Sequence, residues 1–181
     1  VQYIEQEKMT RFIFRNTVTA TPSPLTGSRR RGAQVTPYEA VQFMNGIQEL
    51  AESTRLGIPA LFKSNARNHY DHNAIAGISV PAGSFSEWPK EAGLAATRDM
   101  GLIAEFAQIM AREWTAIGLR AMYGYMADLG TEPRWYRIHE TFTEDADLAA
   151  DIMTVLVKNL QGESLNSKSI ALTMKHFPGG G

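Results

Sequence analysis

Lys175 and His176 stand side by side directly after an apolar run, residues 170–174, that has the character of a β-strand. A lysine offers hydrogen-bond donors, and an imidazole can donate or accept. The carboxyl ends of parallel strands are where α/β barrels build their sites. The pair therefore predicts part of a binding site for a polar ligand that is rich in hydroxyl groups.

Two further polar clusters follow apolar runs earlier in the chain. Asn65 opens a cluster behind the run 60–62, and Arg137 ends a polar segment that begins at Asp128, behind the run 119–123. If these runs are neighbouring parallel strands, the three clusters lie along one rim of the sheet. Arg137 would add a second cationic donor to that rim. Polar residues that only stabilise loops are the alternative interpretation. The first cluster consists of Asn65, Arg67, Asn68 and His69.

Two sequence patterns raise the question of a metal ion or a phosphate group. His69 and His72 have His-x-x-His spacing, but they lie in a predicted loop without a third ligand at fixed distance, which favours a surface loop. The glycines at 179–181 lack the Gly-Lys-Ser/Thr ending and the following helix of a phosphate-binding loop. We therefore expect no metal ion and no cofactor.

Acidic side chains gather at Glu140, Glu144, Asp145 and Asp147. Paired carboxylates would suit the acid and base steps of glycoside hydrolysis. The last three also fit the start of a helix, where negative charge is favoured and a capping box between Thr141 and Glu144 is expected. For them the structural interpretation is preferred. For Glu140, an ion pair with Arg134 or Arg137 is the alternative to a catalytic role.

These side chains must be positioned by elements that alternate between strands and helices. The clearest boundary is at Thr36, Pro37 and Glu39, because the threonine can cap a helix, the proline suits its first position and the glutamate can reach back. Apolar residues then recur at helical spacing. The expected strands are 11–15, 60–62, 119–123 and 169–174, and the expected helices run over about 37–51, 102–117 and 143–160.

This order, βαβαβαβ, predicts an α/β fold with a parallel sheet. Eight such units close a barrel, so four strands make the first half of a (β/α)8 TIM-type barrel, incomplete in this chain. The sequence ends on three glycines, which follow the strand, its Lys-His pair and Phe177-Pro178. We therefore expect residues 1–181 to be part of a larger protein.

Composition excludes several classes of protein. Of the 181 residues, 44% are hydrophobic and 20% charged, and the formal net charge is −1. Such a balance argues against a nucleic-acid partner, which needs a basic surface. The absence of cysteine excludes disulfides, thiol catalysis and cysteine-ligated metals. No stretch approaches the roughly 20 apolar residues of a membrane span.

Three blocks of the sequence resemble family-3 glycoside hydrolases. They are Leu56-Gly57-Ile58-Pro59, the segment 133–145 with Arg-Trp-x-Arg at 134–137, and Lys175-His176-Phe177-Pro178-Gly179-Gly180. Their order and spacing match the family, and the likeness extends from about Arg11 to the end of the chain. The resemblance implies the first part of the N-terminal (β/α)8-type domain of a retaining exo-β-glycosidase, most often a β-glucosidase. A second α/β sandwich domain usually follows.

The resemblance also assigns roles to individual residues. It implies that Arg137, Lys175 and His176 hydrogen-bond the hydroxyl groups of the terminal sugar of a β-linked glucoside or oligosaccharide. In the family, an aspartate just after the second strand usually hydrogen-bonds the outer hydroxyls of the sugar. Asn65 stands at that position here. An amide can donate and accept, but it carries no charge. Tyr136 replaces the more usual glycine between the tryptophan and Arg137.

The family's nucleophile and acid/base lie downstream of the Lys-His pair, so we expect no catalytic residue in this chain and no activity of residues 1–181 alone. The remainder of the same protein would supply them. Two other functions stay open. One is a β-N-acetylglucosaminidase of the same family, in which a histidine typically stands where this chain has Gly180. The other is a non-catalytic carbohydrate-binding protein. The resemblance favours a periplasmic or secreted protein.

Overall fold

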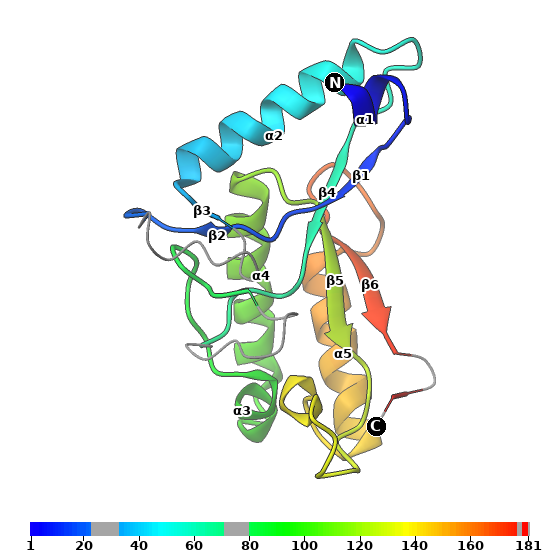
Figure 1. Ribbon diagram of the computed structural model, residues 1–181. Coiled ribbons are helices and arrows are strands. Elements are labelled where there is room, and N and C mark those ends of the chain that lie inside the picture. Colours follow the sequence, from blue (N-terminus) through cyan, green and yellow to red (C-terminus); the bar gives the residue numbers. More distant parts are fainter. Residues whose placement is uncertain (23–32, 71–79, 177–178, 181) are drawn as a thin grey trace.

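The computed structural model describes residues 1–22, 33–70, 80–176 and 179–180, and a four-stranded sheet runs through its centre (Figure 1). The strands lie in the order β1-β4-β5-β6, and every neighbouring pair is parallel. The predicted α/β fold with a parallel sheet is therefore confirmed. The strands are β1 (Arg11–Ile13), β4 (Leu61–Ser64), β5 (Ala121–Met126) and β6 (Ala171–Lys175).

Three long helices connect these strands: α2 (Pro37–Glu52), α4 (Met100–Ala116) and α5 (Ala146–Leu160). The start of α2 is the predicted capping box. Thr36 Oγ1 accepts the Glu39 N–H at 3.1 Å, and Glu39 Oε2 accepts the Thr36 N–H at 2.8 Å. These bonds satisfy backbone donors that a helix cannot pair within itself, which fixes where α2 begins.

Several short elements also occur that the sequence pattern did not predict. The two-residue strands β2 and β3 pair in parallel away from the main sheet, and α3 lies within the long stretch between β4 and α4. Elements this short carry too few residues to show a period. They are α1 (Gln2–Glu5), β2 (Thr17–Val18), β3 (Gln34–Val35), α3 (Glu91–Ala96) and the 3-10 helix η1 (Ile138–Glu140).

The helices cover one face of the main sheet. Phe62 of β4 and Met122 of β5 are 2% and 0% exposed, and α4 and α5 pack side by side behind these strands (Figure 1). On the other face, Ile13 is 57% and Tyr123 39% exposed. Because helices line only the outer face of a barrel wall, this one-sided cover is the arrangement expected for part of a (β/α)8 barrel.

The third predicted strand is shifted along the chain. Leu119 is fully buried, but its N–H bonds the Trp114 carbonyl at 3.0 Å, so it belongs to the turn that closes α4. The strand begins two residues later, at Ala121, and continues to Met126. This extension carries the end of β5 to the rim where the polar clusters lie.

The predicted start of the last helix was wrong. Thr141 does not cap it, because its hydroxyl donates to the Ile138 carbonyl at 2.7 Å within the turn of η1. Asp145 is the cap instead, and its Oδ1 accepts the N–H groups of Asp147 and Leu148 at 3.0 and 3.1 Å. The structural interpretation is confirmed for Asp145, which caps the helix, and Asp147 lies in the first turn.

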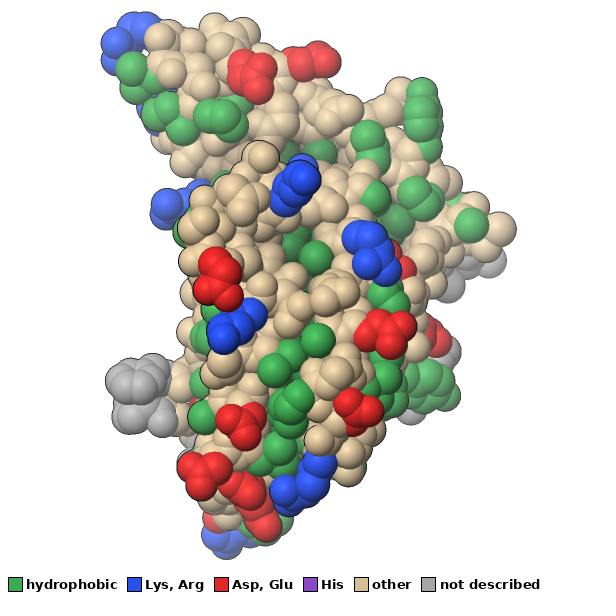
Figure 2. All heavy atoms as spheres, turned by 180° about the vertical axis from the view of Figure 1, so that it is seen from behind, with side chains coloured by type: hydrophobic (Ala, Val, Ile, Leu, Met, Phe, Trp, Pro, Cys, Tyr) green, Lys and Arg blue, Asp and Glu red, His purple; other side chains and the backbone are tan. Residues whose placement is uncertain are grey.

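Acidic and basic side chains are interspersed on the face of the molecule shown in Figure 2, with hydrophobic side chains between them. No single sign of charge dominates that face, in agreement with the formal net charge of −1. Within the described ranges, no helix combines the length and the apolar character needed to cross a bilayer.

Candidate functional site

A cleft lies where β4, β5 and β6 reach their carboxyl ends. Three of the four residues predicted to bind a ligand, Asn65, Arg137 and Lys175, line it together. Their chain segments are far apart in sequence, and the parallel sheet brings them to one rim as predicted. His176 lies outside the lining. The other lining residues are Ala66, His69, Val80, Lys90, Glu91, Tyr123, Gly124, Tyr125, Met126 and Glu140.

Arg137 is held in the cleft by Glu140. Its Nε and Nη2 donate to Glu140 Oε2 at 2.8 and 2.6 Å, and Nη2 also lies 3.1 Å from the Met126 sulfur. Arg137 is 9% exposed, so the guanidinium is largely withdrawn from water. The ion pair therefore fixes the cation in one orientation, which leaves the rest of its planar fork available to a ligand. Of the two interpretations of Glu140, the structure shows the ion pair with Arg137.

Lys175 ends β6 and reaches over the ring of Tyr123. Its Nζ lies 3.8 Å from the ring centroid, within the range of a cation–π contact. Burial lowers the pKa of Lys175, and the nearby charge of Arg137 lowers it further, while Glu140 and Asp128 oppose the shift. Two cations thus share the cleft, and a ligand that offers oxygen atoms would relieve their mutual repulsion.

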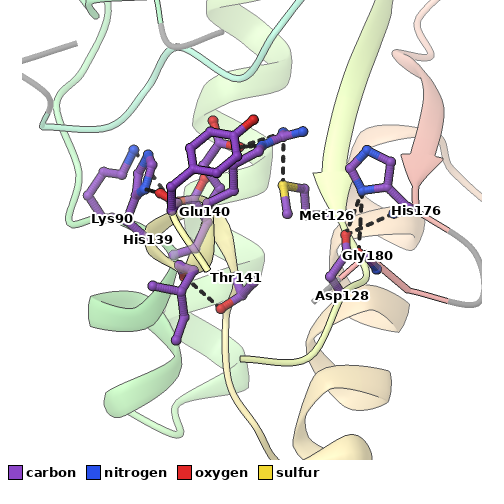
Figure 3. Close-up of polar contacts among 12 residues, drawn as sticks. Lys90, Met126, Asp128, His139, Glu140, Thr141, His176 and Gly180 are labelled. Atoms are coloured by element: carbon purple, nitrogen blue, oxygen red, sulfur yellow. Dashed lines mark hydrogen bonds and ion pairs between the residues drawn. The ribbon is translucent and has the colours of Figure 1, made fainter. Parts of the chain in front are cut away.

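His176 turns toward Asp128 rather than into the cleft (Figure 3). Asp128 Oδ2 accepts the His176 backbone N–H at 2.8 Å and lies 3.1 Å from the ring Nδ1. Its other oxygen accepts the Gly180 N–H. Burial opposes ionisation of Asp128, but these hydrogen bonds and the imidazole together lower the pKa of its carboxyl. The carboxylate therefore ties the loop after β5 to the backbone that follows Lys175.

The substitution Asp128→Asn is expected to lower the free energy of unfolding at pH 7 by about 1–3 kcal/mol, because an amide is a weaker acceptor for these donors. The pKa of Asp128 is lowered from 3.8 in the folded state, so its contribution is present above that value. It is lost as the pH falls through the folded-state pKa. Thermal unfolding midpoints of the two proteins should therefore differ at pH 7 and converge in acid.

Asp145→Asn is the matched control for this measurement, since asparagine caps a helix about as well as aspartate. It should leave the midpoint nearly unchanged at both pH values. A gap between Asp128→Asn and wild type that stayed constant with pH would contradict the assigned role of the Asp128 charge.

Arg67 and Asn68 of the first polar cluster are structural. Arg67 is fully buried and donates to the carbonyls of Phe14 and Asn16 at 3.2 and 3.0 Å, which ties the end of β1 to the loop after β4. Burial lowers its pKa to about 9. Asn68 is equally buried and accepts the Trp114 indole N–H at 2.9 Å. For these two, the loop-stabilising interpretation holds.

His69 is enclosed by protein groups. Its Nδ1 lies 2.7 Å from the Pro89 carbonyl and its Nε2 lies 2.9 Å from the Tyr125 hydroxyl. Both ring nitrogens are therefore used, and neither is open to a metal ion. His72, the second member of the His-x-x-His pattern, and Gly181 lie outside the described residues. In the part of the chain that the structure describes, no group of three His, Asp or Glu side chains is placed to hold a metal.

Two charged residues of the cleft, Lys90 and Glu91, were missed by the sequence analysis. They lie at the start of α3, in a part of the chain for which no helix or strand was predicted. Glu91 is 4% exposed, and its Oε1 lies 3.6 Å from His69 Nε2. One weak signal was present in the sequence, because an acid in a first turn and the alanines and leucine that follow it favour a helix.

Comparison with known sequences gives one family over most of the chain. The sequence profile described as "Glycosyl hydrolase family 3 N terminal domain" matches residues 26–181. A "Probable beta-glucosidase C" of Aspergillus flavus is 42% identical over 143 residues, which are 79% of this chain and 22% of that protein. A "Periplasmic beta-glucosidase/beta-xylosidase" of Dickeya chrysanthemi is 40% identical over 147 residues, 80% of this chain and 22% of that protein. The chain thus spans about a fifth of the length of these relatives.

Solved structures give the same fold. A family 3 β-N-acetylglucosaminidase from Paenibacillus sp. str. FPU-7 superposes with a TM-score of 0.75 over 98% of this chain and 29% of its own, at 20% identity. A β-glucosidase from Listeria innocua in complex with isofagomine gives a TM-score of 0.62 over 76% of this chain and 18% of its own, at 28% identity. At 20% identity, the comparison with the Paenibacillus structure supports the fold and not the function.

Proposed function

This chain belongs to glycosyl hydrolase family 3, and we propose that it forms the first part of the barrel domain of a retaining exo-β-glycosidase of the β-glucosidase type. Its substrate would be the terminal β-D-glucosyl residue of a glucoside or oligosaccharide. Relatives that carry β-glucosidase in their names, at 40–42% identity, support this choice of sugar. One of them is described as periplasmic, which supports a periplasmic or secreted location as part of the proposal.

The observation that carries the proposal is the convergence of Asn65, Arg137 and Lys175 on one cleft. Arg137 and Lys175 are each 9% exposed, so a hydrogen bond that either donates to a sugar hydroxyl forms away from competing water. Asn65 adds a neutral group that both donates and accepts. Such a set suits an uncharged ligand with many hydroxyl groups. We propose that these three side chains bind the terminal sugar. We propose further that His176, whose ring lies against Asp128 outside the cleft lining, adds a hydrogen bond to the same sugar.

Hydrolysis with retention needs two carboxyl groups about 5 Å apart across the scissile bond. One attacks the anomeric carbon as the glycosidic bond breaks, and the other protonates the leaving oxygen. The second group then activates the water that releases the sugar from the enzyme. Glu140 is engaged by Arg137 and suits neither role. We propose that both groups come from further sequence of the same protein, so that residues 1–181 supply part of the sugar subsite.

The test is to express the full-length protein and, separately, residues 1–181, and to assay both on aryl β-D-glucosides. We expect turnover by the full-length protein and none by the segment alone. NMR of the first-formed sugar should show the β-anomer, as retention requires. Preference for aryl N-acetyl-β-D-glucosaminides would replace the proposal with the related activity. Binding of glucose without turnover would leave a carbohydrate-binding protein.

A further inference from the structure

Glu91 is a buried carboxylate in the wall of the cleft, and one of its oxygens is unused. The residue is 4% exposed, and Oε2 has no hydrogen-bond partner among the described residues. Lys90 Nζ forms an ion pair with Oε2 at 3.8 Å, which is beyond hydrogen-bond distance. A buried acceptor without a donor is costly, so such a group calls for an explanation in terms of a ligand or a function.

His69, the other neighbour of Glu91, lies too far from Oε1 for a hydrogen bond. A carbonyl oxygen only accepts, so the contact of 2.7 Å to Pro89 places a hydrogen on His69 Nδ1. Burial, and then the charge of Glu91, raise the pKa of Tyr125 well above 10.0, so the phenol keeps its proton. The hydroxyl lies 2.9 Å from His69 Nε2. Glu91 Oε1 lies 3.6 Å from the same nitrogen, which is beyond hydrogen-bond distance.

Glu91 would add a charged acceptor to a cleft in which the amide of Asn65 supplies a neutral one. Arg137 and Lys175 can only donate hydrogen bonds. Glu140 Oε2 is occupied by two donors of Arg137. A sugar hydroxyl donates one hydrogen bond as well as accepting others, so a cleft that binds several hydroxyls needs acceptors of its own.

We propose that Glu91, which lines the cleft, is a substrate-binding residue whose carboxylate accepts a hydrogen bond from one hydroxyl group of the sugar. The inference rests on the proposed function, because it takes the ligand to be a glycoside. It assigns to α3 a part in recognition, which the strands and the η1 segment would otherwise carry alone. A charged acceptor in a buried site also rejects a substrate that lacks the matching hydroxyl, so Glu91 would determine specificity.

The experiment combines Glu91→Gln with substrates that each lack one hydroxyl. Steady-state kinetics of the full-length protein are measured on an aryl β-D-glucoside and on its 2-, 3-, 4- and 6-deoxy analogues. On the parent substrate, Glu91→Gln is expected to lower kcat/KM by about 10- to 100-fold, the loss typical of a hydrogen bond to a charged group. On one deoxy analogue the loss should shrink to within about threefold, because the partner of Glu91 is already missing.

Glu105→Gln, an exposed residue of α4, is the matched control and should leave all five values unchanged. Thermal unfolding is recorded for each variant. If Glu91→Gln is unstable, Glu91→Asp repeats the cycle, since it keeps the charge but withdraws the oxygen by one methylene. An equal loss on all five substrates would mean that Glu91 only supports the fold, and would overturn the inference. Absence of turnover by the wild-type protein would instead overturn the proposed function, and the inference with it.

Discussion

Replacement of Lys175 by Ala in the full-length protein is expected to lower kcat/KM for an aryl β-D-glucoside by about two to four powers of ten. The Nζ of Lys175 is held 3.8 Å from the centroid of the Tyr123 ring at the end of β6, and the residue is 9% exposed. Its removal would leave a sugar hydroxyl without its donor at a largely buried position. Steady-state kinetics on wild type and variant measure the effect.

His139→Ala is the control for this substitution. His139 is exposed, and its Nδ1 lies 3.0 Å from the Tyr136 carbonyl, away from the lining of the cleft. Its replacement should change kcat/KM by no more than about threefold, as for other surface substitutions. A loss below tenfold for Lys175→Ala, with an unchanged melting temperature, would refute the sugar-binding role of Lys175.

Arg137→Ala is expected to cause a loss of similar size, about two to four powers of ten in kcat/KM. Two effects combine here. The cleft loses a cationic donor, and Glu140 loses the ion pair of 2.6 Å that now holds it. We therefore expect this variant, unlike Lys175→Ala, also to lower the melting temperature by several degrees. Kinetics and thermal unfolding of the same preparations measure both effects.

Two further variants separate these effects. Glu140→Gln removes the charge of the partner but keeps Arg137, so it tests the ion pair alone. Arg137→Lys keeps a cation but loses the planar fork whose Nε and Nη2 both reach Glu140, and it should recover only part of the activity. If Glu140→Gln reproduced the whole loss, Arg137 would act on Glu140 and not on the sugar.

The parts of the fold that could be predicted are those whose signals are local. The capping box at Thr36 and Glu39 is complete within four residues, and the apolar period of α4 runs over four turns. Boundaries that are decided by backbone hydrogen bonding and not by residue type were predicted less well. Leu119 has the apolar character of a strand residue, but its N–H is taken by the carbonyl of Trp114. Nothing in the residue type distinguishes these two outcomes.

The residues of the candidate site show the same difference between what could and what could not be predicted. Asn65, Arg137 and Lys175 could be placed together because each follows a predicted strand or its loop, and parallel strands end on one rim. The position of Glu91 could not be predicted, because it depends on how α3 packs. Leu94 and Ala95 of α3 are 0% and 3% exposed in the core, and this packing brings Glu91 to the cleft. That packing depends on residues far along the chain. Its alanine-rich run was a helix signal too short to be distinguished from a loop.

The hydrogen bonds of Asp128 affect the entropy of ligand binding. Its two oxygens accept backbone N–H groups of His176 and Gly180, on either side of the segment that follows Lys175. The backbone freedom of His176 and Gly180 is therefore lost when the protein folds and not when a sugar binds. Binding of a sugar near these residues should therefore cost the protein little conformational entropy. Calorimetry on Asp128 variants would then show weaker binding through a less favourable entropy, even though Asp128 itself lies outside the cleft lining.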